Sequence, residues 1–264
     1  MWGSAQLLAH GIDRSWLERR MRTDPVVHAF AVWDLLHAPD RVRFVSFRKG
    51  DATTGYLLIW QGNTSYPVVH WVDAPRASDE LAEALPERPL VAVVPPHARA
   101  AVEAHRGPVR SYPVELLIHP RSTPVSTEPS RTSRRLTPAD ANRLRDFVRT
   151  PNDLLLSTYP AMDLATTHVV GSFEGGDLVA VGRAAVELPA VWILSGIYTH
   201  PDHRGRGHGT AVTAALTGAA HAEGAAGALY VRTDNAPARR AYATVGYRFH
   251  SERYWLDAGA HAEP

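Results

Sequence analysis

A basic loop with three glycines is the stretch that most constrains the fold of this chain. The sequence Arg-Gly-Arg-Gly-His-Gly-Thr occupies residues 204–210, between an apolar run, Val191–Thr199, and an alanine-rich segment of helical spacing, Thr210–Ala220. Glycines let backbone N–H groups turn toward a ligand, and a helix N-terminus carries a partial charge of about +0.5. A strand, this loop and a helix start together predict a pyrophosphate-binding site.

Glycine spacing distinguishes between the common phosphate-binding loops. A P-loop requires Gly-x4-Gly-Lys-Ser/Thr, and no lysine stands at the required position here. A dinucleotide-binding loop requires Gly-x-Gly-x-x-Gly, whereas the third glycine of this stretch comes one residue too early. The stretch fits Arg-x-x-Gly-x-Gly instead, with Arg204, Gly207 and Gly209 at the fixed positions.

A second pattern follows downstream, between an expected strand and an expected helix. Asn235 can either cap that helix or bind a ligand through its amide. Ala238 and Tyr242 are four residues apart and share one helical face, and Gly246 suits the left-handed residue that ends a helix. Together the two patterns resemble the GNAT superfamily of N-acetyltransferases over about residues 135–256.

The resemblance implies that acetyl-CoA, or another acyl-CoA, is the cosubstrate. It would lie where the strands Val191–Thr199 and Ala228–Arg232 diverge. The implied cofactor-binding residues are Ile197, Tyr198 and Thr199 on the strand, Arg204, Gly205, Arg206, Gly207, His208, Gly209 and Thr210 in the loop, and Asn235 and Arg239 downstream.

The implied reaction is the direct attack of an amine on the thioester. Tyr242 would protonate the departing thiolate; its alternative role is that of a helix tyrosine packed on the sheet. A backbone N–H near Tyr198 or Thr199 would polarise the thioester carbonyl. An alkyl amine has a pKa of about 10, so a base or a water chain must take its proton.

The base is where the chain departs from the family pattern. Many members carry a glutamate early in the strand before the loop, but Val191–Ser195 contains no acid. Glu187 is the nearest substitute and is our candidate base, with a surface charge of a hairpin as its alternative role. His200, Asp202 and a water relay without a single base remain open.

Three histidines close in sequence suggest a metal site as an alternative. His200, His203 and His208 offer ligands that zinc accepts. However, His208 lies inside the glycine loop, and a metal there would compete with the geometry that the glycines serve. We therefore predict no metal.

Composition excludes several other classes of function. The chain has 264 residues, 45% of them hydrophobic, a net charge of +1 and no cysteine. A thiol nucleophile and disulfides are therefore excluded, and nothing in the charge favours nucleic acid or membrane partners. With no leader-like N-terminus and no apolar run near ~18 residues, we expect a cytoplasmic protein. Homodimerisation is left open.

The order of expected elements predicts an α/β (mixed α+β) fold, a GNAT-like mixed sheet flanked by helices, built as a tandem. Each half reads three strands, helix, strand, helix, strand. The expected strands are 41–49, 55–61, 66–72, 90–94 and 112–119, then 168–173, 178–186, 191–199, 228–232 and 248–256. The expected helices include 78–85, 96–105, 210–220 and 236–245, and the tail 257–264 is expected to fray.

The predicted domains are a degenerate GNAT-like domain at 1–120, a Pro/Ser/Thr-rich linker at 121–135 and an acetyl-CoA-binding GNAT domain at 136–264. The first half has no glycine in its corresponding turn, residues 73–78, so we expect a single cofactor site. A degenerate half followed by an active half also looks like the glycine-N-acyltransferase-like branch.

We therefore expect an N-acetyltransferase that acts on the amine of a small molecule or amino acid. A protein N-terminus or lysine is the alternative acceptor, and a CoA-binding sensor without activity is the alternative function. The acceptor pocket is expected to involve residues 151–165, the surroundings of Glu187 and the N-terminal half.

Overall fold

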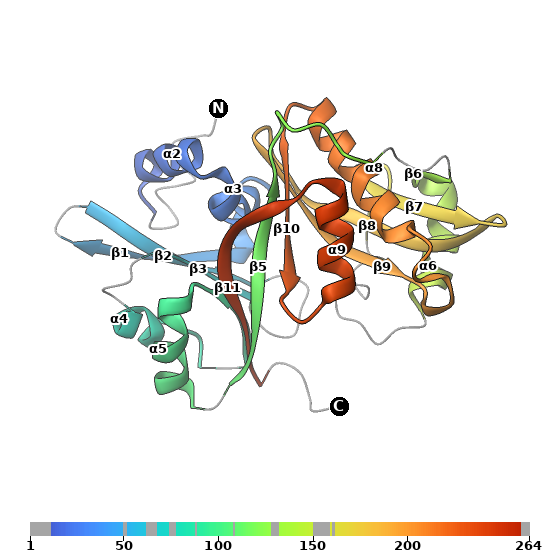
Figure 1. The fold of residues 1–264 in the computed structure, drawn as a ribbon. Helices are drawn as coiled ribbons and strands as arrows, with labels where there is room; N and C mark the ends of the chain where they lie inside the picture. The colour runs from blue at the N-terminus through green and yellow to red at the C-terminus, as the bar shows by residue number, and fades with distance from the viewer. Residues whose placement is uncertain are drawn as a thin grey trace. The chain divides into compact units, whose positions relative to one another are not determined.

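A computed structural model describes residues 12–259, apart from 50–51, 62–67, 74–77, 88, 108, 128–131, 150–158 and 160–161 (Figure 1). The chain divides into two compact units, the first made of residues 1–115 and 251–264 and the second of residues 116–250. Each unit contains strands of a mixed sheet flanked by helices, so the predicted mixed α+β class is confirmed. Among the described residues, no helix has the length and apolar character needed to cross a membrane.

Unit 1 is built on a sheet with the strand order β1-β2-β3-β4-β11. These strands are β1 (Val42–Lys49), β2 (Ala52–Trp60), β3 (Val68–Asp73), β4 (Leu90–Val94) and β11 (Arg248–Ala258). Neighbouring strands are antiparallel except for β3 and β4, which are parallel. All five residues of β4 are buried, as a strand covered on both faces requires.

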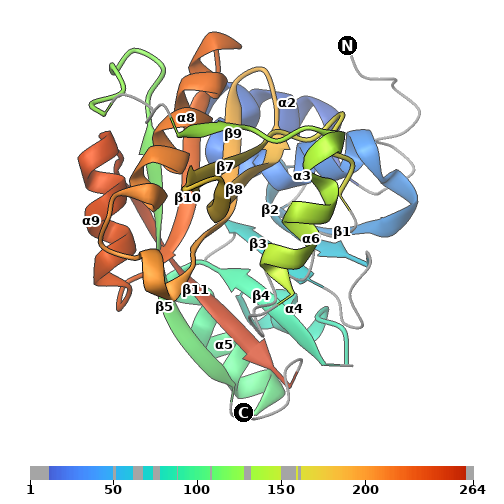
Figure 2. The same ribbon diagram turned by 90° about the vertical axis from the view of Figure 1, so that its right-hand side faces the viewer.

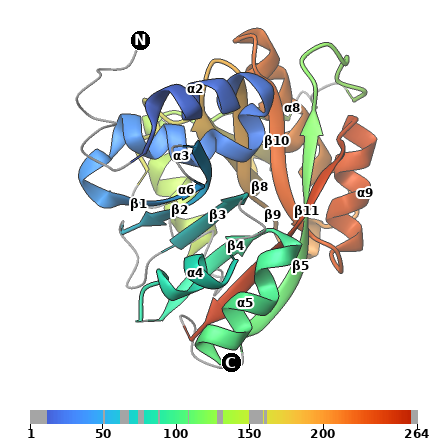
Figure 3. The same cartoon turned by 90° about the vertical axis from the view of Figure 1, so that its left-hand side faces the viewer.

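The described helices of unit 1 flank these strands (Figure 3). They are α2 (Arg14–Thr23), α3 (Pro25–His37), α4 (Ser78–Glu83) and α5 (Pro96–Arg106), and a short 3₁₀ helix, Pro39–Arg41, follows α3. Helix α3 begins as its sequence predicts: the Asp24 side chain accepts from the Val27 N–H, and Pro25 takes the first helical position. The core beneath α4 and α5 joins Ala82, Ala98 and Val102 to apolar residues of the strands.

Unit 2 has the strand order β5-β10-β9-β8-β7-β6. The strands are β5 (Arg110–His119), β6 (Ser133–Arg135), β7 (Val169–Glu174), β8 (Asp177–Glu187), β9 (Val191–Thr199) and β10 (Ala226–Arg232). Strands β6 to β9 pair antiparallel, whereas β9 and β10 are parallel. Strands β7 and β8 form a hairpin, with Gly175 and Gly176 both at positive φ in its turn.

The helices of unit 2 lie on opposite faces of its sheet (Figure 2). Helices α8 (His208–Ala222) and α9 (Ala236–Val245) cover one core, in which Val212, Leu216 and Val245 meet strand residues such as Leu194. Helix α6 (Ala141–Val148) covers the other core, which contains Val181 of β8. Short 3₁₀ helices, Pro138–Asp140 and Pro201–His203, precede α6 and α8. Thr137 caps the first of them, as predicted.

The element order confirms the predicted repetition. The described chain reads β1-β2-β3-α4-β4-α5-β5 and later β7-β8-β9-α8-β10-α9-β11. The domain boundaries at 120 and 136 stay a prediction; the compact units divide instead at 115/116 and 250/251. The turn 74–77, whose lack of glycine predicts a single cofactor site, lies outside the described residues.

One local prediction needs correction. The tail was expected to fray from residue 257, but Asp257 and Ala258 pair with Val91 and Leu90 and extend β11. Asp257 is buried and lies 3.7 Å from Arg110, which explains the added order. Residues 133–135 of the predicted linker 121–135 form the edge strand β6, which places Arg134 and Arg135 on a strand edge, and the bounds of the linker stay a prediction.

Candidate functional site

Strands β9 and β10 pair only along their first halves. Their parallel register runs from Val191 opposite Ala226 to Leu194 opposite Leu229, while both strands continue beyond it. On its other side β9 stays paired with β8 as far as Thr199. The edge of β9 that faces β10 is therefore open over 195–199 within these described strands. The predicted divergence is confirmed.

A glycine marks the place where the divergence begins. Gly196 has φ +62°, and the pairing of β9 with β8 is irregular on either side of it. The Tyr159 hydroxyl donates to the Gly196 carbonyl at 2.8 Å, and a Cβ added at Gly196 would lie 2.8 Å from the same hydroxyl oxygen. A side chain cannot be placed there without moving Tyr159, so this irregular strand depends on glycine.

The glycine loop follows β9 and leads into α8. Gly205 and Gly207 have φ +75° and +85°, and a Cβ added at either would meet no atom within 4 Å. The space beside them is open, and their need for glycine is conformational. The Ala211 N–H is the first to bond back into the helix, to the Gly207 carbonyl, so the preceding N–H groups are available to an anion.

The third glycine serves a close approach. A Cβ added at Gly209 would lie 3.3 Å from Thr199 Oγ1, so the start of α8 packs against the end of β9. The open edge of β9 and the N-terminus of α8 are thereby neighbours in unit 2. This adjacency is what the sequence predicted from a strand, a glycine loop and a helix start.

Both loop arginines are held by the protein itself. Arg204 Nε donates to the Thr199 carbonyl at 3.1 Å, and its guanidinium lies 5.8 Å from the centre of the Tyr198 ring. Arg206 Nη1 donates to Glu174 Oε1 at 2.8 Å. Both side chains are exposed, so they place positive charge at the loop without closing it.

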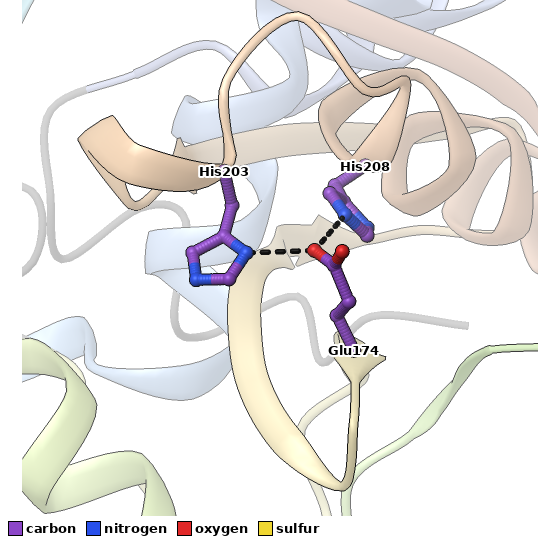
Figure 4. Close-up of side chains that lie close together, drawn as sticks. All are labelled: Glu174, His203 and His208. Atoms are coloured by element: carbon purple, nitrogen blue, oxygen red, sulfur yellow. Dashed lines mark hydrogen bonds and ion pairs between the residues drawn. The ribbon is translucent and has the colours of Figure 1, made fainter.

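Glu174, at the end of β7, gathers the loop histidines (Figure 4). Its Oε2 lies 2.7 Å from His203 Nδ1 and 3.2 Å from His208 Nε2. His208 Nδ1 is in turn 3.0 Å from the hydroxyl of the buried Ser172. The His208 side chain therefore points to β7, and only its backbone is oriented for a phosphate.

This cluster lowers the pKa of Glu174 from its usual 4.5 to about 2. The hydrogen bond from His203 is the main cause, helped by Arg206 and His208 and opposed by desolvation. The three donor atoms of Glu174, His203 and His208 lie within 4.8 Å of one another, a separation that a metal ion could bridge. His200 is outside this group, and its Nδ1 lies 3.7 Å from Asp202 Oδ2. The absence of a metal stays a prediction.

Helix α9 confirms the capping role of its first residue. Asn235 Oδ1 accepts from the Ala238 N–H at 3.2 Å, and Gly246 ends the helix at φ +115°. Arg239 is exposed one turn into the helix. The predicted contacts of Asn235 and Arg239 with the cofactor stay a prediction.

Tyr242 is buried on the inner face of α9. Only 8% of its surface is exposed, it packs in the core with Val245 and Tyr247, and burial raises its pKa to about 12. Within the described part of the chain, its hydroxyl has no hydrogen-bond partner. The ring thus has the packing role that was the alternative, while the hydroxyl stays protonated and can donate. The catalytic role stays a prediction.

Glu187, the candidate base, is engaged by His168. Its Oε1 accepts from the His168 N–H at 3.0 Å, and its Oε2 lies 2.6 Å from His168 Nδ1. Arg135 Nη1 lies 3.1 Å from the other ring nitrogen of His168, which fixes Nδ1 as the donor to Glu187. Glu187 also pairs with Trp192, seven residues or about 23 Å along β9 from Thr199. These contacts support a structural role.

Sequence reasoning missed four residues that organise this region. Tyr159 and Glu174 hold the β9 irregularity and the loop, and Ser172 orients His208. Arg183, the charged residue inside the apolar strand β8, was read as part of the strand alone. Of the segment expected to form the acceptor pocket, 151–158 and 160–161 lie outside the described residues.

Comparisons with known proteins agree with this geometry. Residues 169–256 match the family described as FR47-like protein, which is related to GNAT. Among curated proteins, no sequence matches this chain.

Solved structures share the fold over most of the chain. A protein from Drosophila is 17% identical over 96% of this chain and 88% of its own, with a TM-score of 0.63. A GCN5-related N-acetyltransferase from Kribbella flavida is 18% identical over 86% of this chain and 93% of its own, with a TM-score of 0.60. A tandem GNAT protein from the clavulanic acid biosynthesis pathway is 16% identical over 90% and 89%, with a TM-score of 0.52. The resemblance to GNAT and the tandem fold are confirmed, whereas the glycine-N-acyltransferase-like branch stays a prediction.

Proposed function

From this GNAT fold, we propose that the chain transfers an acyl group, acetyl in the first instance, from acyl-CoA to the amine of a small molecule or amino acid. One observation carries the proposal: the open edge of β9 lies beside the glycine-opened N-terminus of α8. Amide groups of a pantetheine arm suit the former, and a pyrophosphate suits the latter.

The donor-binding residues in this proposal belong to two elements. The main chain of Ile197, Tyr198 and Thr199 borders the open edge and would pair with the pantetheine amides. The N–H groups over 205–210 would bind the pyrophosphate, and Arg204 and Arg206 add positive charge beside it. Bound there, the acyl-CoA supplies the thioester that the amine attacks.

The proposed chemistry needs an oxyanion donor and a donor for the departing sulfur. A main-chain N–H of Tyr198 or Thr199 on the open edge suits the first role. Tyr242 suits the second, because burial of the residue keeps its hydroxyl protonated at neutral pH, and the hydroxyl has no partner among the described residues.

The amine must lose a proton before it attacks. Glu187 remains the carboxylate nearest in sequence to the position where many GNAT members carry an acid, but both its oxygens contact His168. A water chain that leads the proton to solvent fits these contacts better. In that case the hydrogen bonds between Glu187 and His168 contribute to stability and not to catalysis.

Release of CoA thiol tests the proposed function directly. The purified chain is mixed with acetyl-CoA and a panel of small primary amines, amino acids and lysine-containing peptides, and free thiol is followed over time. Amine-dependent thiol release supports the proposal. Binding of acetyl-CoA without thiol release from any acceptor contradicts it and identifies a CoA-binding sensor.

A further inference from the structure

Arg183 is a charged residue on an interior strand of unit 2. It lies on β8, opposite Val169 of β7 and Ser195 of β9. Directly opposed residues share a face of the sheet, and Arg183 shares its face with Tyr159, since its guanidinium lies 5.5 Å from the centre of that ring. This is the face covered by α6 and not by α8.

The Arg183 guanidinium is half-buried. Among the described residues its enclosed Nε has no hydrogen-bond partner, and Nη1 lies 3.7 Å from the thioether sulfur of Met162. No carboxylate pairs with Arg183 among the residues that the structure describes. Other arginines of the unit are paired, Arg134 with Asp140 at 2.7 Å and Arg206 with Glu174 at 2.8 Å.

An unpaired cation in this setting is unfavourable for folding. Desolvation lowers the pKa of the Arg183 guanidinium, with a smaller opposing effect of Tyr159. A thioether is a weak acceptor, and a ring face replaces only part of the lost hydration. A buried charge that has no anionic partner among the described residues is typical of a site that binds a ligand of opposite charge.

The position of Arg183 connects it with the proposed reaction. Its cross-strand neighbour Ser195 is the residue at which the open edge of β9 begins. Neighbouring strands lie about 4.8 Å apart. Because Arg183 is on β8, a group bound to it is separated from the open edge, where the acyl donor is proposed to bind, by the width of β9 alone. A planar guanidinium matches a carboxylate through two parallel hydrogen bonds.

We propose that Arg183 binds the carboxylate of the acceptor, so that the amine substrate is a free amino acid. The inference rests on the proposed function, because it specifies the acceptor of that same site. Carboxylate binding at Arg183 holds the amine toward the open edge of β9. The amine of a protein N-terminus or a lysine side chain carries no such carboxylate, because its neighbouring carbonyl is a neutral amide.

Matched acceptor pairs test this inference. Thiol release from acetyl-CoA is measured for each of the common amino acids, for its carboxamide and for the amine that lacks the carboxyl group. The expected result is a kcat/KM for the preferred amino acid about 10- to 100-fold above that of its carboxamide, the range expected for a charge-assisted hydrogen-bonded pair. The difference should lie mainly in KM.

Variants separate binding from a structural effect. Arg183→Gln and Arg183→Met should abolish the preference for the acid over the carboxamide, with an unchanged or higher Tm. Arg183→Lys keeps the charge and should retain part of the preference. Arg145→Gln, which removes an exposed arginine of α6, is the matched control and should leave the preference intact.

The outcomes distinguish this inference from the proposed function. Equal use of acid and carboxamide by the wild type, or an unchanged preference in Arg183→Gln, overturns the role of Arg183 while acyl transfer stands. If no acceptor releases thiol, calorimetry measures whether amino acids bind to the protein in the presence of CoA. Carboxylate-dependent binding that Arg183→Gln abolishes supports the site although transfer fails, and the absence of such binding overturns both.

Discussion

The Tyr159 hydroxyl donates a 2.8 Å hydrogen bond to the carbonyl of Gly196, and the two residues fit so closely that a Cβ at Gly196 would lie 2.8 Å from that hydroxyl oxygen. Gly196 is also the residue at which β9 turns away from β10. A contact between a buried tyrosine and a strand glycine therefore marks the place where an acyl donor would enter the sheet.

Gly196→Ala should weaken acetyl-CoA binding and destabilise the chain. The added methyl group meets Tyr159 and the backbone holds φ +62°, which together cost about 1–3 kcal/mol. Gly176→Ala is the matched control, since it has φ +96° in the hairpin turn and open space around its Cβ. Thermal unfolding and calorimetry check both. Equal losses of acetyl-CoA affinity in the two variants would be inconsistent with a special role for Gly196.

Tyr242→Phe should lower kcat about 10- to 100-fold while leaving acetyl-CoA affinity and Tm nearly unchanged, because the hydroxyl that it removes has no partner in the described part of the chain. Tyr247→Phe is the control: its hydroxyl bonds Thr217 at 2.9 Å, so it should cost about 1 kcal/mol of stability and no turnover. Steady-state thiol release measures both. Unchanged kcat in Tyr242→Phe would remove the hydroxyl from the mechanism.

Glu187→Gln should lower stability by about 1 kcal/mol through its bonds to His168, and should change kcat less than threefold. We expect this small change because both carboxylate oxygens of Glu187 already contact His168, and because its partner on β9, Trp192, is seven residues from Thr199. Unfolding curves and thiol release check it. A tenfold or larger loss of kcat with unchanged Tm would instead restore Glu187 as the base.

Glu174 should make stability depend on acidic pH. Its pKa is lowered from 4.5 to about 2 in the folded chain, so its contacts stabilise the fold above pH 4.5 and lose their effect as the pH falls toward 2. Glu174→Gln should therefore lower Tm at pH 7, and the difference from wild type should disappear between pH 4.5 and 2. The exposed Glu223→Gln is the control. A difference that persists at pH 2 would mean that charge is not the cause.

Local patterns predicted most of the fold. Strands β4 and β9 and helix α9 have the boundaries that their apolar periodicity and capping residues indicated. The glycine loop was recognised because conformational freedom and helix starts leave a signature in adjacent residues. Its positive φ at Gly205 and Gly207 is observed.

The missed features depend on register and tertiary contact. A glycine inside the apolar strand β9 was a signal for the irregularity at Gly196, although its partner Tyr159 lies 37 residues away. Glu174 ends β7, and no spacing in the sequence shows that it reaches His203 and His208. The burial of Arg183 without an anion is likewise visible only after its neighbours are placed.

The central claim is that the loop between β9 and α8 binds the pyrophosphate of acyl-CoA, and calorimetric titration with acetyl-CoA tests it most directly. The wild type is compared with Gly207→Ala, which strains a residue at φ +85°, and with Gly218→Ala, which adds the same methyl group to open space within α8. The account predicts binding by the wild type and Gly218→Ala, and an affinity at least tenfold weaker in Gly207→Ala. The absence of acetyl-CoA binding by the wild type, or equal affinity in all three proteins, would contradict it.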